Sequence, residues 1–405
     1  MKKVIKSLPV VLCFCVLLGG CGKEPEGEFL ESIEIDSSVE EVDFAASQEF
    51  WASQCPVQKG EEGYYYVTPD WLIAYKDMKT GLNIPLCNKP ECTHKEKDCN
   101  ARLSSAGEAA FVQEWNLRYC DGRLYIIVMT DKNEERSAGL FEIQTDGSGI
   151  QWIQNLYQYA KGEQDDHYLR HFVTDHGYAY YALLIGMETG SSSYEIYRIL
   201  LEEGAKPEKI MESSEADAEK DFWIDQFSVW NSKLYFSFRS NDGSKSTLIE
   251  YDPGSQKERV VLKGEEIGIC AMAKGLLYFA GEEPGIQVLN LETGEIQSLL
   301  KSPESLGKGG LGSFCRLSRD GQYLYAHDMN TPDEADETGN RRETAEIFVF
   351  DLKGNLVEIL EAPNTGESFN AYWGDPDILV IYNSYGYLYY DKQTKEWKEW
   401  GEWDK

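Results

Sequence analysis

Short hydrophobic runs alternate with turn-forming residues along most of the chain. The pattern is clearest between Lys274 and Leu300, where three hydrophobic runs (276–279, 286–291 and 296–300) are separated by turns containing Pro284-Gly285 and Gly294. Short β-branched and aromatic runs bounded by glycine, proline and asparagine are typical of an antiparallel meander. The pattern therefore predicts strands that are joined by tight turns.

The same strand–turn–strand unit occurs seven times between residue 63 and residue 391. Its first strand follows a glycine, aspartate or asparagine and has a hydrophobic or aromatic centre, usually a tyrosine. The aligned central residues are Tyr65, Tyr125, Tyr180, Tyr235, Tyr278, Tyr325 and Ile381, at spacings of 60, 55, 55, 43, 47 and 56 residues.

Recurring β units of roughly 40–50 residues, lengthened by loops, indicate a propeller. A single four-stranded sheet cannot bury both of its faces, whereas sheets stacked around an axis cover one another. Two stacked β-sandwiches are the alternative, but they need no such period. We therefore predict an all-β fold over residues 48–405, a β-propeller with seven four-stranded blades. Six or eight blades stay open, because the first and last units are the least regular.

The first twenty residues resemble a bacterial lipoprotein signal peptide. Lys2, Lys3 and Lys6 precede an apolar segment, Leu8 to Leu18, which is too short to span a bilayer as a helix. The segment ends in Leu18-Gly19-Gly20-Cys21, which resembles a lipobox, so residues 1–20 are expected to be removed and Cys21 to carry fatty acyl chains such as palmitate. The alternative is an ordinary secretion signal in which Cys21 has no role.

Residues 21–47 are predicted to form a flexible acidic tether between the lipid and the propeller. Nine acidic residues and one lysine lie between Gly22 and Asp43, and like charges extend a chain. The alternative is that Ile33 and Ile35 add an outer strand to the propeller. The formal charge of the whole chain is −31, which disfavours binding to nucleic acid and to anionic lipid.

The turn between the second and third runs of several units has a common chemistry. Residues 77–81, 291–294 and 391–395 share a pattern close to acid-x-x-Thr-Gly, in which a short polar side chain holds the turn and glycine takes a positive φ. These repeats are similar to extracytoplasmic propellers of the TolB-like and quinoprotein-like kind and to lipoprotein propellers of Gram-positive anaerobes. The resemblance implies the fold and a location on the outer face of a bacterial cytoplasmic membrane.

Three cysteines and a histidine lie within thirteen residues at the spacing C-x4-C-x-H-x4-C: Cys87, Cys92, His94 and Cys99. This is the ligand set of a closed structural zinc site. Four protein ligands leave no open position, which disfavours a catalytic metal. Disulfides are the alternative, with Cys55 or Cys120 as further partners, because an exported protein can be oxidised. Free thiols are a third interpretation. The lipoproteins named above have a similar loop near their first blade.

Two other segments are candidates for function. Asp165-Asp166-His167 with His171 could bind a metal or supply an acid/base group, but the favoured interpretation is a solvated connection between blades. The acidic segment from Asn330 to Ala345 could be a binding loop, and a solvated excursion is favoured there as well.

No Gly-x-Ser-x-Gly, His-Glu-x-x-His or phosphate-binding loop motif occurs in the sequence. The favoured function is therefore that of a non-catalytic binding or scaffolding module, a lipid-anchored monomer. Its partner would be a protein, peptide or glycan of the cell envelope. The alternative is a propeller-type enzyme that acts on cell-envelope or external glycans.

Overall fold

The structure, a computed structural model, describes most of the repeat region. The signal peptide, Cys21, the tether with Ile33 and Ile35, and most of the segment from Asn330 to Ala345 lie outside the described residues. The described residues are 57–68, 70–103, 109–112, 117–132, 135–159, 167–185, 193–212, 222–240, 245–265, 268–273, 275–280, 285–301, 315–317, 323–327, 344–363, 371–375, 377–383 and 386–400.

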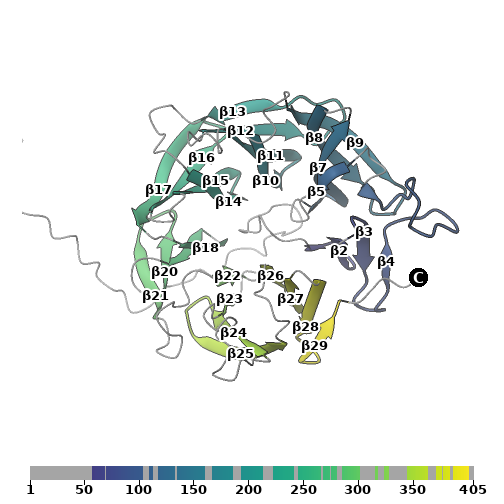
Figure 1. Cartoon of the computed structure of the whole chain (residues 1–405). Coiled ribbons are helices and arrows are strands. Elements are labelled where there is room, and N and C mark those ends of the chain that lie inside the picture. The colour runs from purple at the N-terminus through teal and green to yellow at the C-terminus, as the bar shows by residue number, and fades with distance from the viewer. Residues whose placement is uncertain are drawn as a thin grey trace, which may run out of the picture.

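The described strands form seven antiparallel sheets, which follow one another around a ring in chain order (Figure 1). The predicted seven-bladed β-propeller is confirmed. Blades 1 to 3 contain β1 (Val57–Lys59), β2 (Tyr64–Val67), β3 (Ile73–Lys76), β4 (Asn83–Pro85); β5 (Ala109–Val112), β6 (Arg118–Cys120), β7 (Arg123–Lys132), β8 (Glu135–Ile143), β9 (Ile150–Gln158); and β10 (His167–Asp175), β11 (Tyr178–Ile185), β12 (Ser193–Leu200), β13 (Glu208–Glu212).

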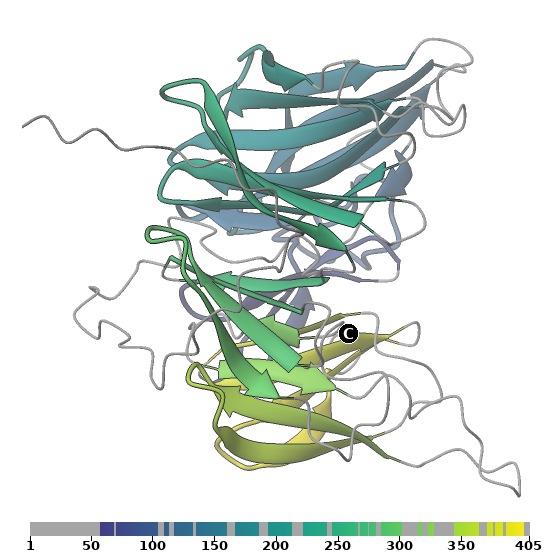
Figure 2. The ribbon, with the colours of Figure 1, turned by 90° about the vertical axis from the view of Figure 1, so that its left-hand side faces the viewer.

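Each of the remaining blades has four strands in sequence order. In the side view, the colour passes from teal at the top through green to yellow at the bottom as the blades succeed one another (Figure 2). Blades 4 to 7 contain β14 (Phe222–Trp230), β15 (Lys233–Ser240), β16 (Lys245–Asp252), β17 (Lys257–Glu265); β18 (Gly268–Ala273), β19 (Leu276–Ala280), β20 (Gly285–Asn290), β21 (Ile296–Lys301); β22 (Cys315–Leu317), β23 (Tyr323–His327), β24 (Thr344–Asp351), β25 (Leu356–Pro363); and β26 (Ala371–Gly374), β27 (Ile378–Asn383), β28 (Gly386–Asp391), β29 (Glu396–Glu399).

The repeated tyrosines all lie in the second main strand of a blade, and most of them pack against the following blade. Tyr65 shares a hydrophobic cluster with Tyr119 of blade 2, Tyr125 shares one with Phe172 of blade 3, and Tyr325 shares one with blade 7. The core is therefore distributed between neighbouring blades, which is the physical reason why the sequence repeats. Among the described residues, no helix is long and apolar enough to cross a membrane.

Where they are described, the turns before the second strand and after the third strand of a blade lie on one face of the ring, which we call the tight-turn face. Asp77 Oδ1 accepts hydrogen bonds from the amides of Lys79 (2.8 Å) and Thr80 (3.2 Å), and Gly81 has φ = 75°, as the sequence predicts. In blade 5 the corresponding acceptor is Asn290, not the acidic Glu292 of the sequence pattern. The side chain that holds the turn lies four residues before the glycine, and there an amide oxygen serves as well as a carboxylate.

The ring is closed by aromatic side chains between blade 7 and blade 1. Trp400 follows β29 and is 2% exposed, and its ring contacts those of Tyr64 and Tyr66 in blade 1 at 5.9 and 5.5 Å between centroids. It also contacts Tyr387 (6.1 Å) and Tyr389 (5.6 Å) in blade 7. All four described strands of blade 1 come from residues 57–85, and those of blade 7 from residues 371–399. Side chains therefore close the ring, with no exchanged strand among the described residues.

Polar contacts reinforce the same junction. Lys59 Nζ lies 2.9 Å from Asp375 Oδ2 and 3.0 Å from Asp377 Oδ2. Lys76 Nζ donates to the carbonyl of Trp400 at 2.6 Å. Because Asp375 is buried and paired, the loss of Lys59 would leave a buried carboxylate without its cation.

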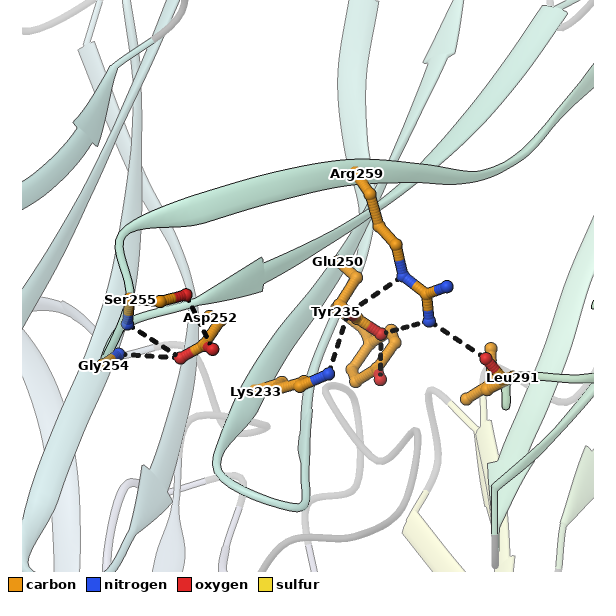
Figure 3. A network of polar contacts seen from close by, with 8 residues as sticks. All are labelled: Lys233, Tyr235, Glu250, Asp252, Gly254, Ser255, Arg259 and Leu291. Atoms are coloured by element: carbon orange, nitrogen blue, oxygen red, sulfur yellow. Dashed lines mark hydrogen bonds and ion pairs between the residues drawn. The ribbon is translucent and has the colours of Figure 1, made fainter. Parts of the chain in front are cut away.

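A buried glutamate connects blade 4 to blade 5. Glu250 on β16 is 6% exposed and accepts hydrogen bonds from Tyr235, Lys233 and Arg259 (Figure 3). Arg259 also donates to the carbonyl of Leu291 at 3.0 Å, in the blade 5 turn. Burial raises the pKa of Glu250, but the bonds from Arg259, Tyr235 and Lys233 outweigh it and lower the pKa to about 2.

We expect Glu250→Gln to lower the free energy of unfolding at pH 7 by about 2 kcal/mol, because Lys233, Arg259 and the buried Tyr235 hydroxyl lose their carboxylate partner. Because folding lowers the pKa of Glu250, the ionised side chain stabilises the wild-type protein fully above the unfolded pKa near 4.5. This stabilisation disappears as the pH falls toward about 2. Urea unfolding at pH 7 and pH 3 measures this. The deficit of the variant should shrink at pH 3, whereas Glu258→Gln, at an exposed position nearby, should have little effect at either pH. An equal loss of stability at pH 7 and at pH 3 would contradict the interpretation that Glu250 stabilises the fold as an ionised carboxylate.

Candidate functional site

The four predicted ligands lie on a loop that interrupts the outer strand of blade 1. The amide of Leu86, just after β4, donates to the carbonyl of Ile73, and the amide of Ile73 donates to the carbonyl of Ala101. The chain therefore leaves the sheet after residue 86 and returns to the same neighbour at residue 101. We call residues 87–100 the cysteine loop. Because its two ends meet at one residue, Cys87 and Cys99 are close despite their separation in sequence.

The structure brings all four predicted ligands together. Cys87, Cys92, His94 and Cys99 each offer one ligand atom, and these atoms lie within 4.8 Å of one another. Cys99 Sγ is 3.5 Å from His94 Nδ1. His94 has φ = 62°, a left-handed conformation that is unusual for a side chain with a Cβ. Cys87, Cys92, Cys99 and Cys120 are free thiols in the structure.

The thiols of the cluster differ in their acidity. Burial raises the pKa of Cys99 to about 12. Burial also opposes ionisation of Cys87, but the amides of Lys89 and Asn100 donate to its sulfur, and the net effect is a lowered pKa. A metal ion would deprotonate even the buried thiol, because a coordinated sulfur is a thiolate.

Polar contacts hold the cysteine loop in shape. Glu96 accepts a bond from Thr93 Oγ1 at 2.6 Å, and this bond is the main reason why its pKa is lowered to about 2. Lys89 is paired with Asp98 at 2.9 Å across the loop. Arg102 donates to the carbonyl of His94 at 2.8 Å. These contacts fix the backbone on both sides of each ligand.

The cysteine loop is docked on the third-to-fourth strand turn of blade 2. The amide of Asn88 donates to the carbonyl of Gly147 at 3.0 Å, and Asn100 Nδ2 donates to Gly147 and Ser148 at 3.0 and 2.9 Å. Gly147 has φ = 75°, and a Cβ there would lie 3.0 Å from the amide nitrogens of Cys87 and Asn88. The close approach therefore requires glycine, and the loop joins blade 1 to blade 2.

A cleft of about 640 Å³ opens beside the cysteine loop, between blades 1 and 2 on the tight-turn face. Sequence reasoning missed it, although the tyrosines of the repeats were evident. Its lining combines tyrosines, acidic residues and one end of the loop: Glu61, Glu62, Tyr65, Tyr75, Ile84, Pro85, Leu86, Cys87, Asn88, Tyr119, Gly122, Thr145, Asp146 and Gly147.

The structure does not place the other candidate histidine, His171, in a solvated connection. His171 lies within β10, is buried, and its Nε2 is 2.7 Å from the carbonyl of Ile224 in blade 4. The pairing with β11 shifts between Arg170 and Phe172, so a β-bulge turns this side chain toward the neighbouring blade. For this residue the sequence-based interpretation was wrong. Asp165, Asp166 and Cys55 lie outside the described residues.

No family model matches the chain, and no curated protein matches it. Solved structures do match. A structure from a study of two prolyl endopeptidases has a TM-score of 0.53 at 13% identity, over 88% of this chain and 51% of that one. The chain thus spans about half the length of that enzyme. At this identity the likeness is one of fold.

Two further matches have lower scores. TolB from Acinetobacter baumannii has a TM-score of 0.36 at 14% identity, over 84% of this chain and 77% of that one. An oligogalacturonate lyase in complex with manganese has a TM-score of 0.40 at 11% identity, over 75% and 74% of the two chains.

Proposed function

We propose that this protein is a binding module of the bacterial cell envelope, anchored through lipid on Cys21, in which a zinc-stabilised loop shapes a ligand cleft. The lipobox pattern and acidic tether of the sequence support the anchor. The observation that carries the binding role is that the cysteine loop forms a wall of the cleft: Cys87, Asn88 and their partner Gly147 all line it.

The residues present fit a structural zinc ion. Three sulfurs and one imidazole nitrogen are the donors that zinc prefers, and tetrahedral coordination with Zn–S bonds of about 2.3 Å places sulfurs roughly 3.8 Å apart. The ligand atoms already lie within 4.8 Å of one another, so small side-chain movements suffice. A bound metal would cross-link the loop and so hold Cys87 and Asn88 against blade 2.

The geometry of the cluster argues against a reaction centre. Cys99 and His94 are close enough to resemble a nucleophile and its base, but Cys99 is 0% exposed and a substrate cannot reach its sulfur. Four protein ligands would also leave no coordination position for a substrate. The cluster therefore serves best as a support for the cleft.

Site-specific photo-crosslinking in cells tests the binding role. A photoreactive residue at Thr145, on the cleft wall, should give a discrete adduct in the membrane fraction. The same residue at Ser255, in an exposed turn of blade 4, is the matched control and should give none. Equal adduct patterns at both positions would contradict a specific site. Turnover of a cell-envelope glycan by the purified chain would contradict the non-catalytic role.

A further inference from the structure

A positive charge supplied by the protein accompanies the repeated tyrosine in several blades. Lys392, which follows β28 of blade 7, has its Nζ 5.5 Å from the ring centroids of both Tyr323 and Tyr325 in blade 6. In blade 3, the guanidinium of Arg198 lies 5.4 Å from the ring of Tyr178, two residues before the repeated tyrosine. Such cation–π contacts are favourable because the ring face carries partial negative charge.

In blades 2 and 4 the cation beside the repeated tyrosine is also paired with a glutamate. In blade 4, Lys233 and Arg259 surround Glu250 beside Tyr235, as described above. In blade 2, Arg123 Nη1 lies 3.0 Å from Glu142, which also accepts a bond from Tyr125. In both blades a cation, Arg123 or Lys233, lies two residues before the repeated tyrosine. The glutamate lies directly opposite that tyrosine on the next strand.

Blade 1 has neither partner. The residue two positions before Tyr65 is Gly63, and the residue opposite Tyr65 is Tyr75. A Cβ on Gly63 would meet the carbonyl oxygen of Lys76 and would lie 2.7 Å from the Tyr75 ring, and one on Gly60 would lie 2.5 Å from the Tyr65 ring. Gly60 therefore makes room for the Tyr65 ring, and Gly63 makes room for both the Lys76 carbonyl and the Tyr75 ring, at positions where blades 2 and 4 have an ion pair.

The rings form an aromatic wall of the cleft. The ring of Tyr65 is stacked on that of Tyr119 at 5.7 Å, with 13° between the planes, and lies 5.1 Å from that of Tyr75. All three line the cleft. Tyr75 is half-buried, so its ring is accessible from the cleft, whereas the other two rings are largely covered.

The charged residues that line the cleft are all acidic. Glu61, Glu62 and Asp146 line the cleft and are exposed, and no lysine, arginine or histidine is among its described lining residues. Burial raises the pKa of Tyr119, and the negative charge of Glu61 raises it further. Within the described part of the chain, these three carboxylates form no ion pair, so their field acts on the cleft.

We infer that this cleft binds a primary alkylammonium group, which takes the place that lysine or arginine occupies beside the repeated tyrosine in other blades. The inference deepens the proposed binding function by naming the ligand class. The tyrosine rings would contact the aliphatic chain and the ammonium group, and the carboxylates would face the positive charge. A lysine side chain of a peptide and a free small amine share this chemistry.

Ligand-observed NMR and calorimetry with the full chain test the inference. The probes are Nα-acetyl-lysine amide for a peptide lysine and cadaverine for a free amine, with Nα,Nε-diacetyl-lysine amide as the uncharged control. At least one amine should bind, and the diacetylated control should bind at least about tenfold more weakly. Tighter binding of the lysine amide identifies the peptide as the source, and tighter binding of cadaverine identifies the small amine. Salt should weaken binding because it screens the carboxylates.

Variants assign the binding to the cleft. Tyr75→Leu should raise the dissociation constant about fivefold or more, and Glu61→Gln with Glu62→Gln about tenfold. Thr145→Lys, which supplies a cation from the protein itself, should abolish binding. Glu202→Gln with Glu203→Gln, in an exposed turn of blade 3, is the matched control and should leave binding unchanged.

Two results would overturn the inference: no binding of either amine, or binding that survives all three cleft changes. An adduct at Thr145 in cells together with no amine binding would leave the proposed binding function intact and remove only the ligand class. Circular dichroism of each variant shows whether the fold is retained. Because Thr145 bonds to Tyr65, the variant that leaves the tyrosine rings unchanged is Glu61→Gln with Glu62→Gln, at two exposed positions.

Discussion

Trp400→Ala should lower the free energy of unfolding by about 3–5 kcal/mol, the cost of removing a fully buried aromatic side chain. The ring of Trp400 contacts two tyrosines of blade 1 and two of blade 7. Because side chains close the ring at this junction, the loss should fall mainly on the contact between the first and last blades. Denaturant unfolding gives the magnitude, and hydrogen exchange should show faster opening of β2 and β27 than of blade 4.

Trp397→Ala is the matched control, since the same residue type lies three positions earlier, in β29. Trp397 is only half-buried and contacts Tyr390 within its own blade, at 5.3 Å. Removal of the Trp397 side chain should lower the free energy of unfolding by about 1 kcal/mol and should not speed hydrogen exchange in blade 1. If both variants lose the same stability, or if exchange rises uniformly around the ring, Trp400 does not close the propeller.

The blades could be predicted from the sequence because their signals are local. Alternating hydrophobic residues define each strand, and a polar residue four positions before a glycine defines the turn, as at Asp77 and Gly81. The repeated tyrosines added the period, because most of them pack against the following blade. Ring closure could not be predicted in this way, since Trp400 contacts Lys76 across 324 residues of sequence.

The site was predictable in part. The spacing of Cys87, Cys92, His94 and Cys99 was sufficient to propose one ligand set, because a short loop keeps its members near one another. The docking on Gly147 was not predictable, since it depends on the shape of a turn in the next blade. The cleft was not predictable either, because the role of Gly63 becomes visible only when it is aligned with Lys233 and Arg123 in other blades. His171 was expected in a solvated connection, but a β-bulge places it in the core, and the sequence does not reveal that bulge.

The full chain, purified without chelator, should contain one zinc ion, and Cys99→Ser should contain substantially less. If free zinc exceeds its dissociation constant about a thousandfold, binding contributes about 4 kcal/mol to the stability of the state that binds it. Removal of the metal should therefore expose the cysteine loop, with proteolytic cleavage between Lys89 and Asp98, two positions that are now paired across the loop. Metal analysis and limited proteolysis measure the two effects.

Cys120→Ser provides the matched control, because Cys120 is a buried free thiol outside the cluster. It should lose stability through the buried hydroxyl and yet retain one zinc ion and a protected loop. Thiol titration of the unfolded chain separates zinc from the disulfide alternative, since zinc leaves all three loop cysteines reactive. A chain without metal and without reactive thiols in the loop would establish disulfides. The cleft wall at Cys87 and Asn88 would then be held by covalent bonds, and amine binding should respond to reductant and not to chelator.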